Sequence, residues 1–152
     1  MTGALRDKII GAWELVSYIE RDSPDGPARY PHGEDAQGLI MYTPDGYMSA
    51  QIMTPGRPAY DQPIARGGTT EQAAAAALGY LAYSGPFTVD ESTGVVDHHV
   101  AVSLLPNWLG SVQVRYPELD GDRLTISSTT PLAGGGKVWS TLVWARPGAQ
   151  VA

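Results

Sequence analysis

Hydrophobic and polar residues alternate along much of the chain with the two-residue period of a half-buried β-strand. In the first such run, Trp13, Leu15 and Ile19 fall on the drier face, whereas Tyr18 and Glu20 fall on the other. Turn residues, chiefly Pro, Gly and Asp, separate the runs from one another. The runs span residues 9–20, 37–42, 46–53, 83–90, 95–104, 111–119, 123–128 and 137–146. The pattern therefore predicts eight strands.

A different pattern interrupts the strands after the third run. Residues 54–68 carry three prolines and three glycines, which predicts a long loop. Thr69 and Gln72 then have the spacing of a capping box, and the alanine run 73–77 has high helix propensity. We expect one helix here, with Leu78 and Leu81 as the residues able to dock it on an apolar surface. A mobile helix is the alternative, because an alanine face makes only weak contacts.

Eight antiparallel strands with short connections close most economically into an up-and-down barrel, because closure removes the sheet edges. An eight-stranded barrel also leaves room for one small ligand. The predicted fold is therefore an all-β barrel with one helix inserted after the third strand, and a two-sheet sandwich is the alternative. The length of 152 residues suits a single domain, 1–152, with the barrel core at about residues 9–146.

Charge and composition narrow the range of partners. The formal net charge is −6 and the ten Lys and Arg residues form no cluster, which argues against a nucleic-acid partner. The absence of cysteine excludes disulfides and thiolate chemistry. The sequence contains no apolar run long enough to span a membrane and no secretory leader pattern at residues 1–11, so we expect a cytoplasmic protein without a membrane partner.

Several sequence strings resemble a known family. Gly11 and Trp13 on the first strand, with Arg146 at the end of the last, are similar to the lipocalin signature. Longer strings resemble the bacterial and fungal lipocalin-like domain family: LIMYTPDGYMSA at 39–50, YLAYSG at 80–85 and HHVAVSLLPNW at 98–108. The resemblance implies a lipocalin-type barrel in which Trp13 and Arg146 pack together at the closed end. It also implies proximity to oxidoreductases and natural-product pathways.

Three residues are candidates for catalysis. His98 shares a strand face with Val96 and Val100, as well as with Val102 and Leu104, and is therefore expected to point inward. A histidine in an apolar cavity can serve as a general acid or base, although a core histidine satisfied by a neighbouring hydroxyl is the alternative. Tyr83 and Tyr116 are predicted on the dry phase of their strands and would be its hydroxyl partners.

Five further residues are candidates for ligand binding. They are Tyr42, Tyr47, Met48, Trp108 and Arg115. Tyrosine combines apolar bulk with a polar tip, methionine adapts its shape, and Trp108 follows a strand end where it could close a cavity mouth. Each also has a structural alternative: barrel wall or outer surface for the tyrosines, core for Met48, loop packing for Trp108 and a solvated wall position for Arg115.

No cofactor or metal is expected. His98 and His99 are adjacent on a strand, so their side chains diverge and cannot hold one ion together. No glycine-rich loop of the phosphate-cradling kind precedes the helix.

The sequence supports three functions. The first is a cofactor-independent cyclase or isomerase of secondary metabolism, which would act on a polyketide-like or other oxygenated apolar metabolite through a His or Tyr proton relay. The second is a carrier or sequestering protein for such a ligand. The third is a structural partner subunit, which would need a large apolar exterior patch. A small apolar or aromatic ligand is the expected partner, and a homodimer is compatible with the sequence.

Overall fold

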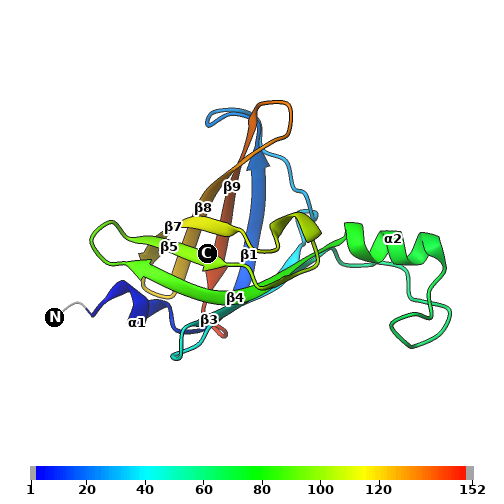
Figure 1. Ribbon diagram of the computed structural model, residues 1–152, viewed down its shortest axis with the longest axis horizontal. Helices are drawn as coiled ribbons and strands as arrows, with labels where there is room; N and C mark the ends of the chain where they lie inside the picture. Colours follow the sequence, from blue (N-terminus) through cyan, green and yellow to red (C-terminus); the bar gives the residue numbers. More distant parts are fainter. Residues whose placement is uncertain (1–2, 150–152) are drawn as a thin grey trace.

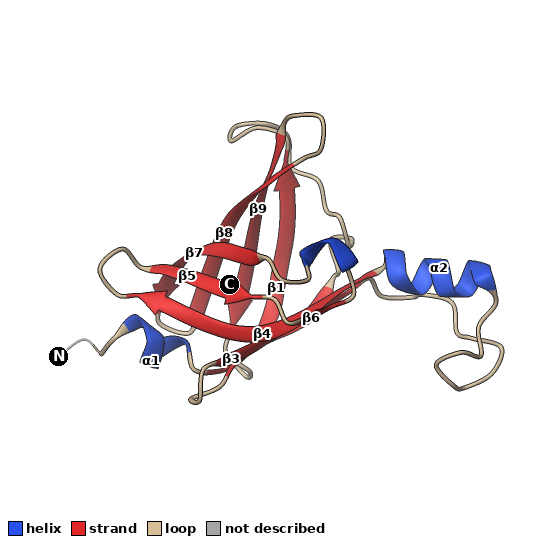
Figure 2. Ribbon diagram, in the orientation of Figure 1, coloured by secondary structure: helices blue, strands red, loops and turns tan. Residues whose placement is uncertain are grey.

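The computed structural model describes residues 3–149, so the outermost residues of the predicted domain 1–152 lie outside the described part (Figure 1). Strands dominate it, and two α-helices and one 3-10 turn accompany them (Figure 2). The elements in chain order are α1 (Leu5–Ile9), β1 (Gly11–Arg21), β2 (Gln37–Tyr42), β3 (Tyr47–Met53), α2 (Thr70–Leu78), β4 (Tyr80–Asp90), β5 (Val95–His99), β6 (Val102–Ser103), η1 (Pro106–Trp108), β7 (Val112–Asp120), β8 (Arg123–Pro131) and β9 (Lys137–Ala145).

Eight of the strands close into an antiparallel barrel. The order of hydrogen-bonded neighbours is β3-β2-β1-β9-β8-β7-β5-β4, and β4 pairs back onto β3 from Tyr47↔Pro86 to Met53↔Tyr80. In Figure 1 the strands β1, β8 and β9 cross β4, β5 and β7 at a steep angle. The predicted barrel is therefore confirmed, and the sandwich alternative is excluded.

In the structure, the fifth predicted strand, residues 95–104, is divided into two shorter strands, β5 and β6. The alternation of β5 stops at His99, and the two-residue β6 pairs separately with β4. Gly85 of β4 allows this crossing, because a Cβ there would lie 1.9 Å from the carbonyl oxygen of His99. Val102 and Leu104 are consequently exposed, at 62% and 44%, so the prediction that they share the inward face of His98 is wrong.

A bulge in β1 reverses the expected faces of its second half. The register against β9 shifts between Leu15 and Ser17. Val16, which lies at the bulge, is 40% exposed, as its predicted face requires. Beyond the bulge Tyr18 is buried, so its predicted assignment to the wetter face is wrong. One extra residue is enough for this change, because successive side chains of a strand point to opposite faces.

The closed end of the barrel is held by Trp13 and Arg146. Trp13 is fully buried, and the Arg146 guanidinium carbon lies 3.8 Å from the centre of its ring, which confirms the predicted contact. The guanidinium also donates hydrogen bonds to the carbonyl oxygens of Lys8 and Ile10, at 2.8 and 2.9 Å. Gly11 has a φ of +111°, and a Cβ there would lie 2.8 Å from Nη1 of Arg146, so glycine is required.

The short helix α1 covers the same end. The Glu91 carboxylate, in the turn between β4 and β5, accepts hydrogen bonds from the backbone N–H groups of Leu5 and Arg6, at 2.8 and 3.1 Å. Ile9 is buried at 1% exposure, and its carbonyl oxygen accepts the indole N–H of Trp13 at 2.9 Å. The sequence pattern predicted neither this helix nor η1.

Residues 54–79 form an arm that projects away from the barrel (Figure 1). The predicted capping box is confirmed: the Thr69 hydroxyl accepts from the Gln72 N–H, and the Gln72 side chain accepts from the Thr69 N–H. The predicted docking is wrong, because Leu78 is 83% exposed and Leu81 belongs to β4. Within residues 3–149, neither helix is long and apolar enough to cross a membrane.

Candidate functional site

A cavity of about 220 Å³ lies inside the barrel. Its wall is mostly aliphatic and aromatic, with polar groups from β1, β4, β5, β7, β8 and β9 between them. The aliphatic lining includes Ile40, Ala50, Ile52, Leu81, Ile126 and Leu142. The polar lining includes Tyr18, Glu20, Tyr83, Arg115, Ser128 and Ser140. A small apolar molecule with oxygen substituents would find both kinds of contact in such a cavity.

His98 is the buried polar centre of this region. It points inward from β5 and is 1% exposed. Its Nε2 lies 2.8 Å from the Tyr42 hydroxyl oxygen, and its Nδ1 lies 2.7 Å from the Tyr83 hydroxyl oxygen. Its predicted inward orientation is therefore confirmed. Tyr83 and His98 both line the cavity, whereas Tyr42 holds the imidazole from the core side.

Burial keeps all three side chains uncharged. Desolvation places the pKa of His98 well below its usual value, and the positive charge of Arg115 lowers it further. Desolvation also raises the pKa of both tyrosine hydroxyls, while Arg115 acts in the opposite direction on them. The imidazole is therefore neutral at pH 7, with one nitrogen that donates and one that accepts.

The hydrogen-bond count favours one tautomer of His98. Among the described residues, Tyr42 is hydrogen-bonded only to Nε2, so a proton on Nε2 would leave the buried Tyr42 O–H without an acceptor. That arrangement would cost about 1–3 kcal/mol. With the proton on Nδ1, Tyr42 donates to Nε2, and Nδ1 donates to Tyr83. The Tyr83 O–H then remains available as a donor to the cavity.

Arg115 and Trp108 lie beside the Tyr83 hydroxyl. The Arg115 Nη2 is 3.5 Å from the Tyr83 oxygen, and its guanidinium lies 5.9 Å from the centre of the Trp108 ring. Trp108, from η1, packs edge-on against the Tyr83 ring at 5.2 Å and lines the cavity. Arg115 thus belongs to the cavity wall rather than to the fully solvated surface, the alternative that sequence left open.

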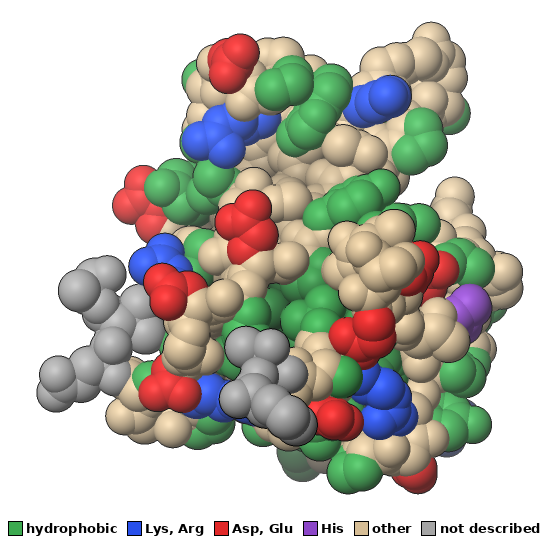
Figure 3. Space-filling model, turned by 90° about the vertical axis from the view of Figure 1, so that its left-hand side faces the viewer, with side chains coloured by type: hydrophobic (Ala, Val, Ile, Leu, Met, Phe, Trp, Pro, Cys, Tyr) green, Lys and Arg blue, Asp and Glu red, His purple; other side chains and the backbone are tan. Residues whose placement is uncertain are grey.

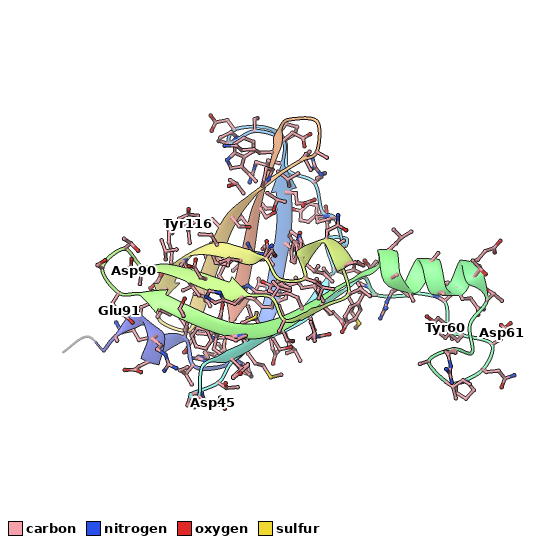
Figure 4. All side chains as sticks on the ribbon, viewed as in Figure 1. Asp45, Tyr60, Asp61, Asp90, Glu91 and Tyr116 are labelled. Carbon is pink, nitrogen blue, oxygen red and sulfur yellow. The ribbon has the colours of Figure 1, made fainter. Side chains whose placement is uncertain are left out.

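The predicted orientation of Tyr116 is wrong. Its side chain is 53% exposed and lies on the outside of the barrel (Figure 4). The inward positions in this part of β7 are held by the polar residues Gln113 and Arg115, which pair with the buried His98 and Val96 of β5, and Arg115 lines the cavity. Val112 and Val114 are exposed on the same outer face as Tyr116. Tyr42, predicted to contact the ligand, takes the place foreseen for Tyr116 as partner of His98.

The first hairpin lines the cavity through Ile40, Ala50 and Ile52 and not through its predicted ligand contacts. Tyr47 is 54% exposed on the outer face of β3, which contradicts its prediction as a ligand contact. Met48 is buried in the core cluster and does not line the cavity, so the structure favours its core alternative. Exposed hydrophobic side chains also occur among charged ones on the face seen in Figure 3.

Several polar residues of the cavity wall were not identified from sequence; they include Tyr18, Glu20, Ser128, Thr130, Ser140 and Trp144. Tyr18 and Glu20 face inward because of the bulge in β1, which the alternation pattern does not reveal. Burial and the neighbouring Glu20 carboxylate raise the pKa of Tyr18 to about 12. Trp144 could have been found, since it shares the inward phase of β9 with Ser140 and Leu142.

Comparisons with known proteins agree with this architecture. The family model described as "Lipocalin-like domain" matches residues 10–147. A protein of Aspergillus oryzae named as a 4'-hydroxy-3'-methoxypropiophenone carrier protein is 42% identical over 106 residues. That match covers 65% of this chain and 96% of the fungal protein.

Proposed function

The chain belongs to the family of lipocalin-like domains, and from that premise we propose that its barrel carries one small aromatic molecule with oxygen substituents. The observation that carries this proposal is the mostly apolar cavity with the Tyr83 hydroxyl in its wall. Burial of the ring would supply most of the affinity, and the hydroxyl would fix the orientation.

The volume of the cavity supports a single-ring ligand. Drug-sized ligands occupy pockets of about 300–1,000 Å³. The cavity measures about 220 Å³, which suits a substituted benzene better than a multi-ring polyketide. The fungal relative named as carrier of a propiophenone supports the same ligand class.

The surroundings of His98 favour a carrier over an enzyme. Both ring nitrogens are hydrogen-bonded to tyrosine hydroxyls, and 1% of the residue is exposed. A general base needs a free nitrogen within hydrogen-bond reach of the substrate proton. His98 would instead act as a positioning residue that orients the Tyr83 hydroxyl.

A cofactor-independent cyclase or isomerase is the second candidate. It is supported by the continuous hydrogen-bond chain from Tyr42 through His98 to Tyr83, which ends at the cavity. Tyr83 could donate to a substrate carbonyl and stabilise the oxyanion of an enolate, with Arg115 nearby to support the negative charge. The two candidates differ in whether the bound molecule is released unchanged.

Binding of 4'-hydroxy-3'-methoxypropiophenone, measured by titration calorimetry, tests the proposal. We expect one molecule per barrel and a loss of affinity of about fivefold to tenfold in Tyr83→Phe, the effect of one hydrogen bond. Tyr116→Phe is the matched control, because the same hydroxyl is removed from the outer face. Absence of binding to the wild-type protein, or an equal loss in both variants, would contradict the proposal.

Mass spectrometry and NMR of the recovered probe separate the two candidates. A carrier returns the probe unchanged after prolonged incubation. Conversion of the probe by the wild-type protein, but not by Tyr83→Phe, would instead establish the enzyme.

A further inference from the structure

Trp144 presents an unpartnered donor at the cavity. It is 1% exposed and lines the cavity from β9. Among the described residues, its indole Nε1 is the buried side-chain polar atom without a hydrogen-bond partner. Trp13, the other fully buried tryptophan, donates its N–H to the Ile9 carbonyl oxygen at 2.9 Å. The barrel therefore satisfies one of its two core indoles and leaves the other, on a residue that lines the cavity, without a partner.

The strand register places Trp144 at the deep end of the cavity. It pairs with Leu15 on β1 and with Leu124 on β8, and Leu124 is fully buried. Two residues further along the chain, Arg146 covers the closed end over Trp13. The opposite end of the cavity is lined by residues near the β8–β9 hairpin, such as Leu132, which is 50% exposed.

The chemistry of an indole N–H limits what can meet it. It donates and does not accept, and a buried donor without a partner costs about 1–3 kcal/mol. Neighbouring lining residues such as Ile126 and Leu142 are aliphatic and offer no side-chain acceptor. A neutral donor in apolar surroundings cannot offset the desolvation of an anion, so the matching group is a neutral oxygen, such as a ketone or an ether.

The cavity wall at Tyr83 differs from the wall at Trp144 because it carries a positive charge. Its hydroxyl lies beside the guanidinium of Arg115, which carries a full positive charge. A partly negative oxygen, such as that of an acidic phenol, is stabilised better beside Arg115 than at the deep end of the cavity near Trp144.

We propose that Trp144 is the specificity-determining residue of the cavity and donates its indole N–H to a neutral ketone or ether oxygen at the deep end of the ligand. The ligand class is then an aromatic molecule with two oxygen groups at its two ends, the more acidic one at Tyr83. This inference rests on the proposed carrier function and adds the orientation of the ligand to it.

Two probes that differ only at the ketone test the inference. They are 4'-hydroxy-3'-methoxypropiophenone and 2-methoxy-4-propylphenol, in which a methylene replaces the carbonyl. We expect the wild-type protein to bind the ketone probe about fivefold more tightly, the contribution of one hydrogen bond. Trp144→Phe keeps an aromatic side chain without the N–H, so this preference should disappear. Trp139→Phe, the same change on the outer side of β9, should retain it.

The possible results distinguish a failure of the inference about Trp144 from a failure of the proposed carrier function. If both probes bind but Trp144→Phe still prefers the ketone, the inference is overturned and the carrier function stands. The same holds if the preference disappears in Tyr83→Phe instead, because the preference would then arise from an oxygen held at Tyr83 and not from a ketone held at Trp144. If neither probe binds to the wild-type protein, the proposed function itself fails, and the inference fails with it.

Discussion

His98 shows how a barrel interior can hold a titratable residue in one protonation state. Tyr42 and Tyr83 contact its two nitrogens, and burial, together with the positive charge of Arg115, lowers the pKa of its imidazole. The unfolded chain has no such restriction, so its imidazole binds a proton near pH 6.5. His98 therefore links the stability of the fold to pH.

We expect the free energy of unfolding to fall as the pH drops below about 6.5. In that range the unfolded state binds a proton at His98 and the folded state does not, so stability decreases by about 1 kcal/mol per pH unit. Urea unfolding between pH 7 and pH 5 measures this slope. His32, whose pKa is also lowered by burial, adds to it in the wild-type protein.

The variant His98→Gln isolates the contribution of this residue. Its slope should be shallower than that of the wild-type protein, because a glutamine amide does not titrate in this range. Identical slopes in the two proteins would show that the folded state protonates His98 as readily as the unfolded chain does.

Trp13 is the residue on which the closed end depends. It is fully buried between Ile9 and the Arg146 guanidinium, so Trp13→Ala removes a large volume and leaves Arg146 without its aromatic partner. We expect a loss of about 3–5 kcal/mol in chemical denaturation. Trp139→Ala, on the outer side of β9, should cost clearly less. An unchanged midpoint for Trp13→Ala would show that the residue does not belong to the core.

At the scale of elements, the strands and the arm differ in how they are stabilised. Each barrel strand pairs with two neighbours, whereas α2 contains no buried residue and touches the barrel mainly through β4. The helix therefore depends on its own capping box and on the propensity of its alanines. Such an element opens locally without unfolding the barrel.

We expect Thr69→Ala to weaken α2 without changing the melting temperature of the barrel. Loss of the cap costs about 1 kcal/mol, and the amides of residues 73–79 should exchange with solvent faster by roughly fivefold. Thr70→Ala is the control, because it changes the first helical residue and leaves the cap intact. A fall in the barrel melting temperature with Thr69→Ala would show that the arm and the barrel unfold together.

Two strands show where the reasoning from alternation succeeds and where it fails. On β5 the apolar phase of Val96 correctly predicts that His98 points inward. On β7 the same rule fails, because the inward residue Arg115 is polar and the outward residues Val114 and Tyr116 are not. The rule assumes a dry interior, and a ligand cavity with a polar wall violates that assumption.

At the scale of the whole molecule, closure of the sheet makes one barrel with an internal cavity from eight strands. The pairing of β3 with β4 joins residues on the two sides of the arm and completes the ring. Closure also brings Tyr42 of β2 to His98 of β5, which the neighbouring strand β4 already pairs with Tyr83. It positions Trp144 and Tyr83 in the wall of one cavity.

The sequence by itself determined the eight runs of strand, the capped helix between the third and fourth of them, and the contact of Trp13 with Arg146. The strands follow from the two-residue period of hydrophobic positions and from the turn residues between them, and the helix follows from its capping residues. The contact follows from the resemblance to a family with the same signature. The tertiary structure alone decided which face of β7 lines the cavity, where the bulge in β1 turns Tyr18 inward, and which hydroxyls meet His98. The physical reason is that register and bulges are set by neighbouring strands, and a shift of one residue exchanges the two faces of a strand.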